Sequence, residues 1–246
     1  MDHPIRFETV TKSFGSLTVL KEVTFEVPRG KVLCVLGRSG TGKSVLIKQI
    51  VGLIPPDSGR IYVQNEEITS LPPRKLAAVR KRMGFLFQYS ALFDSISVGE
   101  NVAFPLRRHT TLSREEIRDK VSRKLRRVGL EGIQNKMPSE ISGGMRKRVG
   151  LARALALDPP ILLADEPSSG LDPVTSREID TLFLDLKHHE ETTMVIVTHH
   201  IPSARRIGDE LAVLHEGRML ARGSAAELEE SEHEIVREFM RSEGAI

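Results

Sequence analysis

The sequence has little sulfur, few aromatic side chains and no long apolar run. Its 246 residues include one cysteine and no tryptophan, and aromatic residues make up 4% of the chain. The single cysteine, Cys34, cannot form an internal disulfide, which indicates a reducing compartment such as the cytosol. Because Cys34 lies within an apolar stretch, we expect it to be a buried core residue and not a nucleophile.

Membrane-spanning and secretory segments are not expected. The longest apolar runs, such as Val32–Leu36 and Met194–Val197, are far shorter than the roughly 20 residues that a helix needs to cross a bilayer. The first residues lack the charged and apolar blocks of a signal peptide. The sequence therefore predicts one sizeable core and no transmembrane helix.

Charge of neither sign dominates. The chain has 36 lysines and arginines against 33 acidic residues, a formal net charge of +3. Basic clusters at Arg80–Arg82 and Arg146–Arg148 are compatible with a nucleic-acid or membrane surface. The interspersed acidic residues favour solvated helix faces instead, so we expect no nucleic-acid partner.

The apolar pattern predicts strands alternating with helices. Arg6–Phe14 and Val23–Val27 alternate like half-buried strands, whereas Val32–Leu36 is apolar throughout, as in a central parallel strand. This alternation predicts a parallel α/β core. Further strands are expected at 60–63, 84–87, 161–165 and 194–198, helices at 45–51, 174–187 and 202–208, and a hairpin of 211–214 with 218–221 around Glu216-Gly217.

Residues 89–157 differ in character and are predicted to be helical. Ser113-Arg114-Glu115-Glu116 matches a capping box, and Gly129 is a typical helix end. A helix is also expected over 145–157. We therefore predict a single domain over 1–246, in which 1–88 and 158–246 form the core and about 89–157 form a helical insert. The acidic stretch Glu227–Glu234 is expected to be a solvated helix.

A glycine-rich loop follows the central strand. Gly37-Arg38-Ser39-Gly40-Thr41-Gly42-Lys43-Ser44 matches the phosphate-binding pattern in its required position between a strand and a helix. Its backbone amides and the helix N-terminus favour phosphate. Lys43 is expected to contact the β- and γ-phosphates, and the Ser44 hydroxyl to bind Mg²⁺.

Two carboxylates, Asp165 and Glu166, end the strand at 161–165. Ligands of α/β sheets collect at the carboxyl ends of strands. Asp165 can hold the shell of Mg²⁺, and Glu166 can deprotonate an attacking water. Such a pair alone is often merely solvated, but the phosphate loop makes a catalytic role the better interpretation.

Ser142-Gly143-Gly144 forms a second candidate anion site, because a capping serine and two glycines precede a helix. With the phosphate loop before it and Asp165-Glu166 after it, the chain resembles the ATP-binding cassette (ABC) family of ATPases. The resemblance implies a P-loop NTPase core with an N-terminal antiparallel β subdomain and an inserted helical subdomain. It also implies ATP hydrolysis and a homodimer in which Ser142, Gly143 and Gly144 complete the site of the opposite subunit.

The same resemblance assigns four further residues. Gln88 is similar to the glutamine that reaches Mg²⁺ and the attacking water, and His199 to the histidine that contacts the γ-phosphate. Asp172, in Ser169-Gly170-Leu171-Asp172, matches the loop between the two sites, and Phe14 matches the aromatic that stacks on adenine. The chain departs from the common pattern at Met145, usually glutamine, and at His200, often aspartate.

Ser-Gly-Gly-Met, together with Thr198-His199-His200-Ile201-Pro202, resembles the ATPase of MCE-associated, Mla-type lipid transporters. That resemblance implies transport of phospholipids or other hydrophobic molecules with a multispanning permease and an MCE-domain partner. It places the homodimer on the cytoplasmic face of the inner (plasma) membrane. The permease would dock in a groove near Ser90–Pro105.

Three alternative functions are considered at this point. An ATPase of a polar-solute importer, for example of amino acids, more often carries glutamine at the position of Met145. A soluble ABC ATPase acting on DNA or ribosomes usually has two cassettes, coiled-coil arms or zinc insertions. A nucleotide-sensing module would not need Glu166 and His199.

Overall fold

The computed structural model describes residues 2–242, apart from the side chains of 189 and 190. The strands are β1 (Ile5–Phe14), β2 (Leu17–Val27), β3 (Val32–Leu36), β4 (Ser58–Val63), β5 (Glu66–Glu67), β6 (Met83–Leu86), β7 (Ile161–Asp165), β8 (Thr193–Thr198), β9 (Glu210–His215) and β10 (Arg218–Gly223). The helices are α1 (Lys43–Ile50), α2 (Pro73–Arg80), α3 (Val98–His109), α4 (Arg114–Arg127), the 3₁₀ helix η1 (Pro138–Glu140), α5 (Gly143–Ala154), α6 (Pro173–Glu190), α7 (Ile201–Ile207), α8 (Ala225–Glu229) and α9 (Glu234–Arg241). Within residues 2–242, no helix has both the length and the apolar composition of a membrane span.

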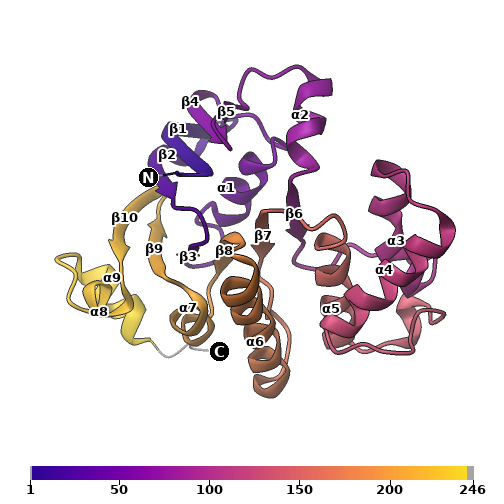
Figure 1. Ribbon diagram of the computed structural model, residues 1–246. Helices are drawn as coiled ribbons and strands as arrows, with labels where there is room; N and C mark the ends of the chain where they lie inside the picture. The colour runs from indigo at the N-terminus through magenta and orange to yellow at the C-terminus, as the bar shows by residue number, and fades with distance from the viewer. Residues whose placement is uncertain (1, 243–246) are drawn as a thin grey trace.

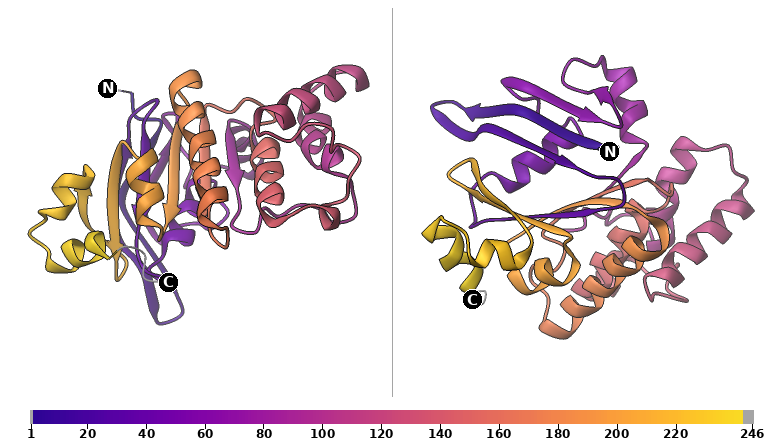
Figure 2. Two further views of the ribbon diagram at one scale, coloured as in Figure 1. Left: turned by 90° about the horizontal axis from the view of Figure 1, so that it is seen from below. Right: turned by 60° about the vertical axis from the view of Figure 1, so that its left-hand side comes forward.

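Two sheets are stacked with helices on the far side. The six-stranded sheet has the order β10-β9-β3-β8-β7-β6, and the four-stranded sheet has the order β2-β1-β4-β5. Figure 2 shows the small sheet on one side of the large sheet and helices α6 and α7 on the other. The strands of the large sheet are parallel except for the antiparallel β10. The predicted parallel α/β core is therefore confirmed.

The central strand β3 is buried on both faces, which explains its unbroken apolar sequence. Leu33 and Val35 pack into a cluster with α1 and the small sheet, whereas Cys34 and Leu36 pack into a cluster with the helices. Cys34 is fully buried, as the sequence predicts. The phosphate loop, which follows Leu36, is thus anchored to a strand that is buried at every residue.

The predicted hairpin is formed by β9 and β10. Glu216 and Gly217 both have positive φ, 46° and 80°, as a two-residue turn of the kind that suits twisted strands requires. The carbonyl oxygen of Gly217 accepts a hydrogen bond from the backbone N–H of Lys21 at 2.8 Å. This contact ties the tip of the hairpin to β2.

The helices α3, α4 and α5 lie beyond the β6 edge of the large sheet (Figure 1). Ser113 and Glu116 form the expected capping box at the start of α4. The prediction of helix throughout 89–157 was too broad, because loops and η1 separate the helices. The helix expected over 145–157 instead runs from Gly143 to Ala154. At Gly84 of β6 a Cβ atom would lie 2.5 Å from the carbonyl oxygen of Ala154, so glycine allows α5 to approach the strand closely.

The acidic stretch 227–234 is not one helix, contrary to expectation. It contains the end of α8, a loop and the first residue of α9. Ser224 and Glu227 form a capping box that starts the short α8. The break before α9 lets Leu228, Val236 and Met240 all reach the core, where each is buried. Burial of these apolar side chains therefore prevails over helix continuity.

Candidate functional site

A cavity of about 1100 Å³ opens at the carboxyl ends of the central strands. Its size suits a nucleotide, since ligand pockets commonly enclose about 300–1,000 Å³. The structure brings together here most of the site residues that the sequence predicts. These are Phe14, Gly37, Arg38, Ser39, Gly40, Gly42, Lys43, Ser44, Gln88, Glu166 and His199.

The phosphate loop connects β3 to α1. Gly42, with φ 104°, is the N-cap of α1, and no side chain caps this helix. The amides of the first turn are therefore left for an anion. Thr41 faces the loop itself, because its hydroxyl donates to the carbonyl oxygen of Arg38 at 2.9 Å. This hydrogen bond helps to fix the shape of the loop, and nucleotide binding by Thr41 stays a prediction.

Lys43 is buried at the base of the loop. Its Nζ donates to the carbonyl oxygens of Gly37 at 2.7 Å and Arg38 at 3.0 Å. The same atom lies 3.7 Å from Oε1 of Glu166. Burial lowers the pKa of Lys43, and the nearby Glu166 carboxylate opposes that shift. The ammonium is therefore positioned for a strong interaction with an anion entering the loop.

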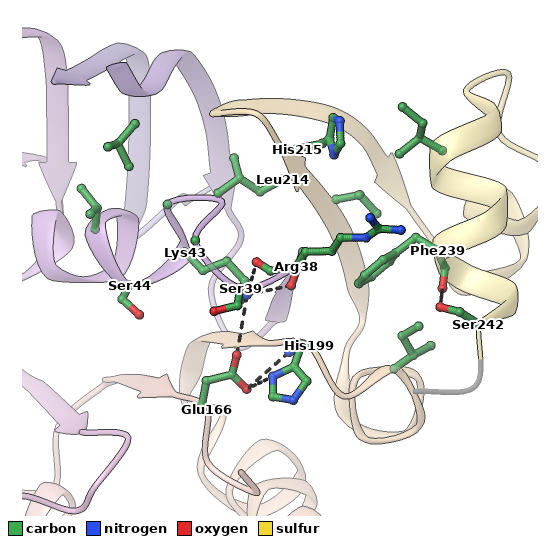
Figure 3. Close-up of a pocket in the computed structure, with 18 of the residues that line it drawn as sticks. Arg38, Ser39, Lys43, Ser44, Glu166, His199, Leu214, His215, Phe239 and Ser242 are labelled. Carbon is green, nitrogen blue, oxygen red and sulfur yellow. Dashed lines mark hydrogen bonds and ion pairs between the residues drawn. The ribbon is translucent and has the colours of Figure 1, made fainter. Parts of the chain in front are cut away.

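Glu166 lies between the phosphate loop and β8 (Figure 3). Its Oε2 lies 2.9 Å from Nδ1 of His199 and accepts hydrogen bonds from the Thr198 hydroxyl at 3.1 Å and the His199 backbone N–H at 3.3 Å. The Glu166 carboxylate is buried, while the His199 side chain is 58% exposed. The carboxylate is thus held facing the cavity next to Lys43.

Ser44 and Asp165 form a small oxygen-rich pair. The Ser44 hydroxyl donates to Oδ1 of Asp165 at 3.1 Å. Burial raises the pKa of Asp165, and the hydrogen bond from Ser44 opposes the rise. Among the side chains that the structure describes, those of residues 2–188 and 191–242, no three of His, Cys, Asp or Glu are grouped to hold a metal. One carboxylate and one hydroxyl nevertheless fit Mg²⁺, which takes its remaining ligands from phosphate and water.

Ser142, Gly143 and Gly144 do not line this cavity. Ser142 caps α5 by accepting a hydrogen bond from the backbone N–H of Met145 at 3.2 Å. At Gly144 a Cβ atom would lie 2.6 Å from Cγ2 of Thr175, so the first turn of α6 packs directly on this turn. A single chain therefore leaves these predicted residues outside the site.

Asp172 also lies outside the cavity lining and is the N-cap of α6. Its Oδ1 accepts hydrogen bonds from the backbone N–H groups of Val174 and Thr175, each at 3.0 Å. The hydrogen bond from the Thr175 side chain is the main cause of a lowered Asp172 pKa. The carboxylate thus fixes the first turn of α6, which packs on Gly144.

The departure at His200 has a structural explanation. His200 is the N-cap of α7, and its Nδ1 accepts a hydrogen bond from the backbone N–H of Ser203 at 3.3 Å. The Ser203 hydroxyl in turn donates to the buried Asp180 at 2.9 Å. An aspartate at position 200 would be suited to the same capping role. Histidine therefore replaces it without loss of the cap.

Sequence reasoning missed the wall that α9 gives to the cavity. Ile235, Glu238 and Phe239 of this helix line it together with Phe14. Phe14 and Ile235 are 49% and 48% exposed. Arg38 extends from the phosphate loop towards Phe239 (Figure 3). The apolar spacing at 235, 236, 239 and 240 indicates an amphipathic helix, but nothing in the sequence indicates what its second face meets.

A second, smaller hollow of about 450 Å³ lies between the core and the helices α3 and α5. Phe85, Phe87, Phe93 and Phe104 line it, and no acidic residue does. The rings of Phe93 and Phe104 lie 4.9 Å apart and are about half exposed. Its cationic lining comes from Arg80, Lys81 and Arg153. This hollow is an apolar surface with a basic rim.

Comparison with known proteins places the chain among transport ATPases. The family described as ABC transporter matches residues 20–169. The chain is 44% identical over 236 residues to a Mycobacterium leprae protein named "Probable ribonucleotide transport ATP-binding protein mkl", covering 96% of this chain and 68% of that protein. It is 40% identical over 226 residues to the Escherichia coli K12 "Intermembrane phospholipid transport system ATP-binding protein MlaF", covering 92% of this chain and 84% of that protein.

Solved structures agree with this likeness. The ATP-binding cassette MJ0796, a dimer bound to ADP and Pi, superposes with a TM-score of 0.84 at 33% identity, covering 89% of this chain and 98% of that chain. CbiO1 from Clostridium perfringens, part of the ABC transporter complex cbiONQ, gives a TM-score of 0.84 at 31% identity, covering 97% of this chain and 94% of that chain. The predicted fold class is confirmed.

Proposed function

The chain belongs to the ABC transporter family and is an ATP-hydrolysing subunit; from this we propose that it powers the movement of phospholipids or other hydrophobic molecules through a membrane permease. The observation that carries the ATPase chemistry is the meeting of Lys43, Glu166 and His199 beside the phosphate loop. The similarity to the phospholipid transport protein MlaF supports the cargo.

In the reaction, water attacks the γ-phosphorus of ATP, and the bond from that phosphorus to the β–γ bridging oxygen breaks. Glu166 takes the proton from the water, because its carboxylate faces the cavity. Lys43 holds the β- and γ-phosphates, for which it exchanges its contacts with the carbonyl oxygens of the loop. His199 stays near the γ-phosphate through its contact with Glu166. The products are ADP and phosphate.

Ser44 and Asp165 are the residues that would hold Mg²⁺, with Gln88 lining the same cavity. The ion would neutralise charge on the β- and γ-phosphates as the transition state forms. The support for this assignment is the hard oxygen donor set, which suits Mg²⁺ better than softer metals.

The functional unit is a homodimer. Four predicted site residues lie outside the cavity of their own chain: Ser142, Gly143, Gly144 and Asp172. In a dimer they complete the nucleotide site of the partner subunit. Ser142 and Gly143 are exposed, which leaves them accessible to a partner. The dimeric MJ0796 cassette provides a precedent in a related protein.

The permease docks in the hollow between the core and the insert of residues 89–157. Exposed apolar rings of Phe93 and Phe104 offer burial to a helix of the permease. The rim of Arg80, Lys81 and Arg153 favours a partner with acidic side chains. Docking at this surface would hold the dimer at the cytoplasmic face of the inner membrane.

The names of the relatives point to different cargoes, phospholipid for MlaF and ribonucleotide for mkl. The chain spans 68% of the length of the Mycobacterium leprae protein but 84% of MlaF. We therefore favour lipid, with an MCE-domain protein as the partner that receives or delivers it. A polar-solute importer is the second candidate, and the name of mkl supports it.

Purification of the tagged chain from its native membranes in mild detergent tests the proposal. A multispanning permease and an MCE-domain protein with bound phospholipid are the expected companions. A permease with a protein that binds nucleotides or amino acids would replace lipid with a polar cargo. Recovery with ribosomes or DNA, without a permease, would contradict the transport function altogether.

A further inference from the structure

Lys147, in the second turn of α5, is a buried lysine that contacts two parts of the site. Its side chain points away from solvent, and the residue is 6% exposed. Its Nζ donates one hydrogen bond to the backbone carbonyl oxygen of Gln88 and another, at 3.0 Å, to that of Glu166. One ammonium group thus joins α5 to the main chains of two residues assigned to the attacking water.

The arrangement is costly for a purely structural residue. Burial lowers the pKa of Lys147, and the charges of Glu166 and Asp165 oppose the shift only in part. Among the buried lysines of residues 2–242, Lys43 and Lys124 each have a carboxylate within ion-pair distance, whereas Lys147 has only carbonyl oxygens. An apolar side chain of similar size would avoid the cost of burying this charge.

The contact to Glu166 falls on a strained part of the backbone. Glu166 has φ 48°, a left-handed conformation that costs a non-glycine residue about 1 kcal/mol or more. Its N–H donates to the carbonyl oxygen of Val197 at 2.9 Å, and its own carbonyl oxygen accepts from the N–H of Ser169 at 3.2 Å. Lys147 donates the third hydrogen bond to the main-chain groups of Glu166, as the second donor to its carbonyl oxygen, and helps to aim the Glu166 carboxylate at the cavity.

Lys147 lies on the helix that begins with the Ser-Gly-Gly turn. Ser142 caps that helix, and Lys147 follows five residues later on its buried side. A helix is stiff over such a distance, so a shift of the capped end displaces the ammonium with it. The ammonium would then displace the carbonyl groups of Gln88 and Glu166.

We propose that Lys147 is a positioning residue for ATP hydrolysis, which transmits the placement of the Ser-Gly-Gly turn to the main chains of Gln88 and Glu166. The inference rests on the proposed role of that turn in completing the partner's site. When the turn binds the nucleotide held by the partner subunit, α5 takes up a fixed position. Lys147 then holds Gln88 and Glu166 in the positions needed for attack by water. Without the ammonium, the phosphates still bind but the water is poorly oriented.

The test compares two buried lysines changed to the same residue. Lys147→Met removes the ammonium and keeps most of the side-chain volume. Lys124→Met is the matched control, because Lys124 is 8% exposed, lies in α4 and pairs with Asp158, away from the cavity. ATPase kcat and KM, the Kd for ATP and the melting temperature are measured for both variants and the original chain.

We expect Lys147→Met to lower kcat by about tenfold or more with an ATP Kd within about twofold of the original, since only positioning for the chemical step is lost. Lys124→Met is expected to keep kcat within about twofold of the original value. We expect this even if its melting temperature falls by as much as that of Lys147→Met. Lys147→Gln retains an N–H donor and is expected to recover part of the kcat.

Equal kcat values for Lys147→Met and Lys124→Met would overturn the inference while leaving the ATPase intact. A parallel loss of ATP binding and thermal stability in both position-147 variants would also overturn it, because it would indicate a structural role alone. If Lys147→Met does not fold, Lys147→Gln decides by the same comparison. An original chain that binds no ATP would instead contradict the proposed function itself.

Discussion

Nδ1 of His199 lies 2.9 Å from Oε2 of Glu166, so the exposed imidazole and the buried carboxylate form a pair that lines the cavity. The carboxylate also faces Lys43 from the opposite side. The proton acceptor is therefore held between two groups that contact phosphate in the proposed mechanism.

The first prediction concerns this carboxylate. Glu166→Gln is expected to keep ATP binding, lower kcat by at least about 100-fold and trap an ATP-bound dimer, because the amide is not a proton acceptor for water. Steady-state ATPase assays and size-exclusion chromatography with ATP measure both effects. Substantial turnover in this variant would remove Glu166 from the role of base.

A second prediction follows from the position of Ser142 outside its own cavity. Ser142→Arg is expected to block hydrolysis by obstructing the partner's site, while the Kd for ATP of the isolated monomer changes little. Nucleotide titration at low protein concentration, combined with ATPase assays at high concentration, separates the two effects. A monomer that hydrolyses ATP at the full rate would contradict the shared site.

The packing of Gly144 on Thr175 gives a third prediction. Gly144→Ala places a Cβ atom 2.6 Å from Thr175 and is expected to destabilise the fold by about 1–3 kcal/mol through overpacking. Gly143→Ala is the matched control for stability, because nothing lies within 4 Å of its Cβ position. Thermal denaturation of both variants provides the comparison. Equal melting temperatures for Gly144→Ala and Gly143→Ala would show that Thr175 can move away from the added methyl group without loss of stability.

The wall formed by α9 gives a fourth prediction. Because Ile235 and Phe14 both expose apolar surface to one cavity, we expect the adenine base to lie between them. Ile235→Ala is then expected to weaken ATP binding about threefold and leave the binding of inorganic triphosphate unchanged. Glu234→Ala, on the same helix but outside the cavity lining, serves as control. Equal weakening for both ligands would place the base elsewhere.

A fifth prediction concerns Cys34. Its complete burial, with the charge of Asp180 adding to the effect, raises the pKa of the thiol far above its ordinary value. The reactive thiolate is therefore scarce in the folded protein at any ordinary pH. Iodoacetamide is expected to leave the native chain unlabelled and to add once after denaturation. Rapid labelling of the native chain would show that β3 opens readily.

The sequence predicts best where a local pattern decides the structure. Three such features are found as expected: the apolar run of β3, the capping box at Ser113 and the Glu216-Gly217 turn. Each depends only on residues that are close together in the sequence. The phosphate loop belongs to this class, because its glycines and the following helix are adjacent in the chain. Such features need no knowledge of distant residues.

Contacts between distant segments could not be predicted in the same way. Lys147 looks like part of a solvated basic cluster in the sequence, yet it is buried against Gln88 and Glu166. The meeting of α9 with the phosphate loop joins residues nearly 200 positions apart. Both depend on how α5 and α9 are oriented by core packing, for which a linear pattern carries no signal.

Phe14 belongs to β1 and Phe239 to α9, the last helix within residues 2–242, yet both line one cavity. Ribosomal synthesis therefore completes the phosphate loop long before it supplies the opposite wall. A truncated polypeptide ending before residue 235 would carry Lys43 and Glu166 but leave the far end of the cavity open. Only a chain that extends through α9 can enclose the whole nucleotide, so ATP would preferentially stabilise products that include this helix over shorter ones.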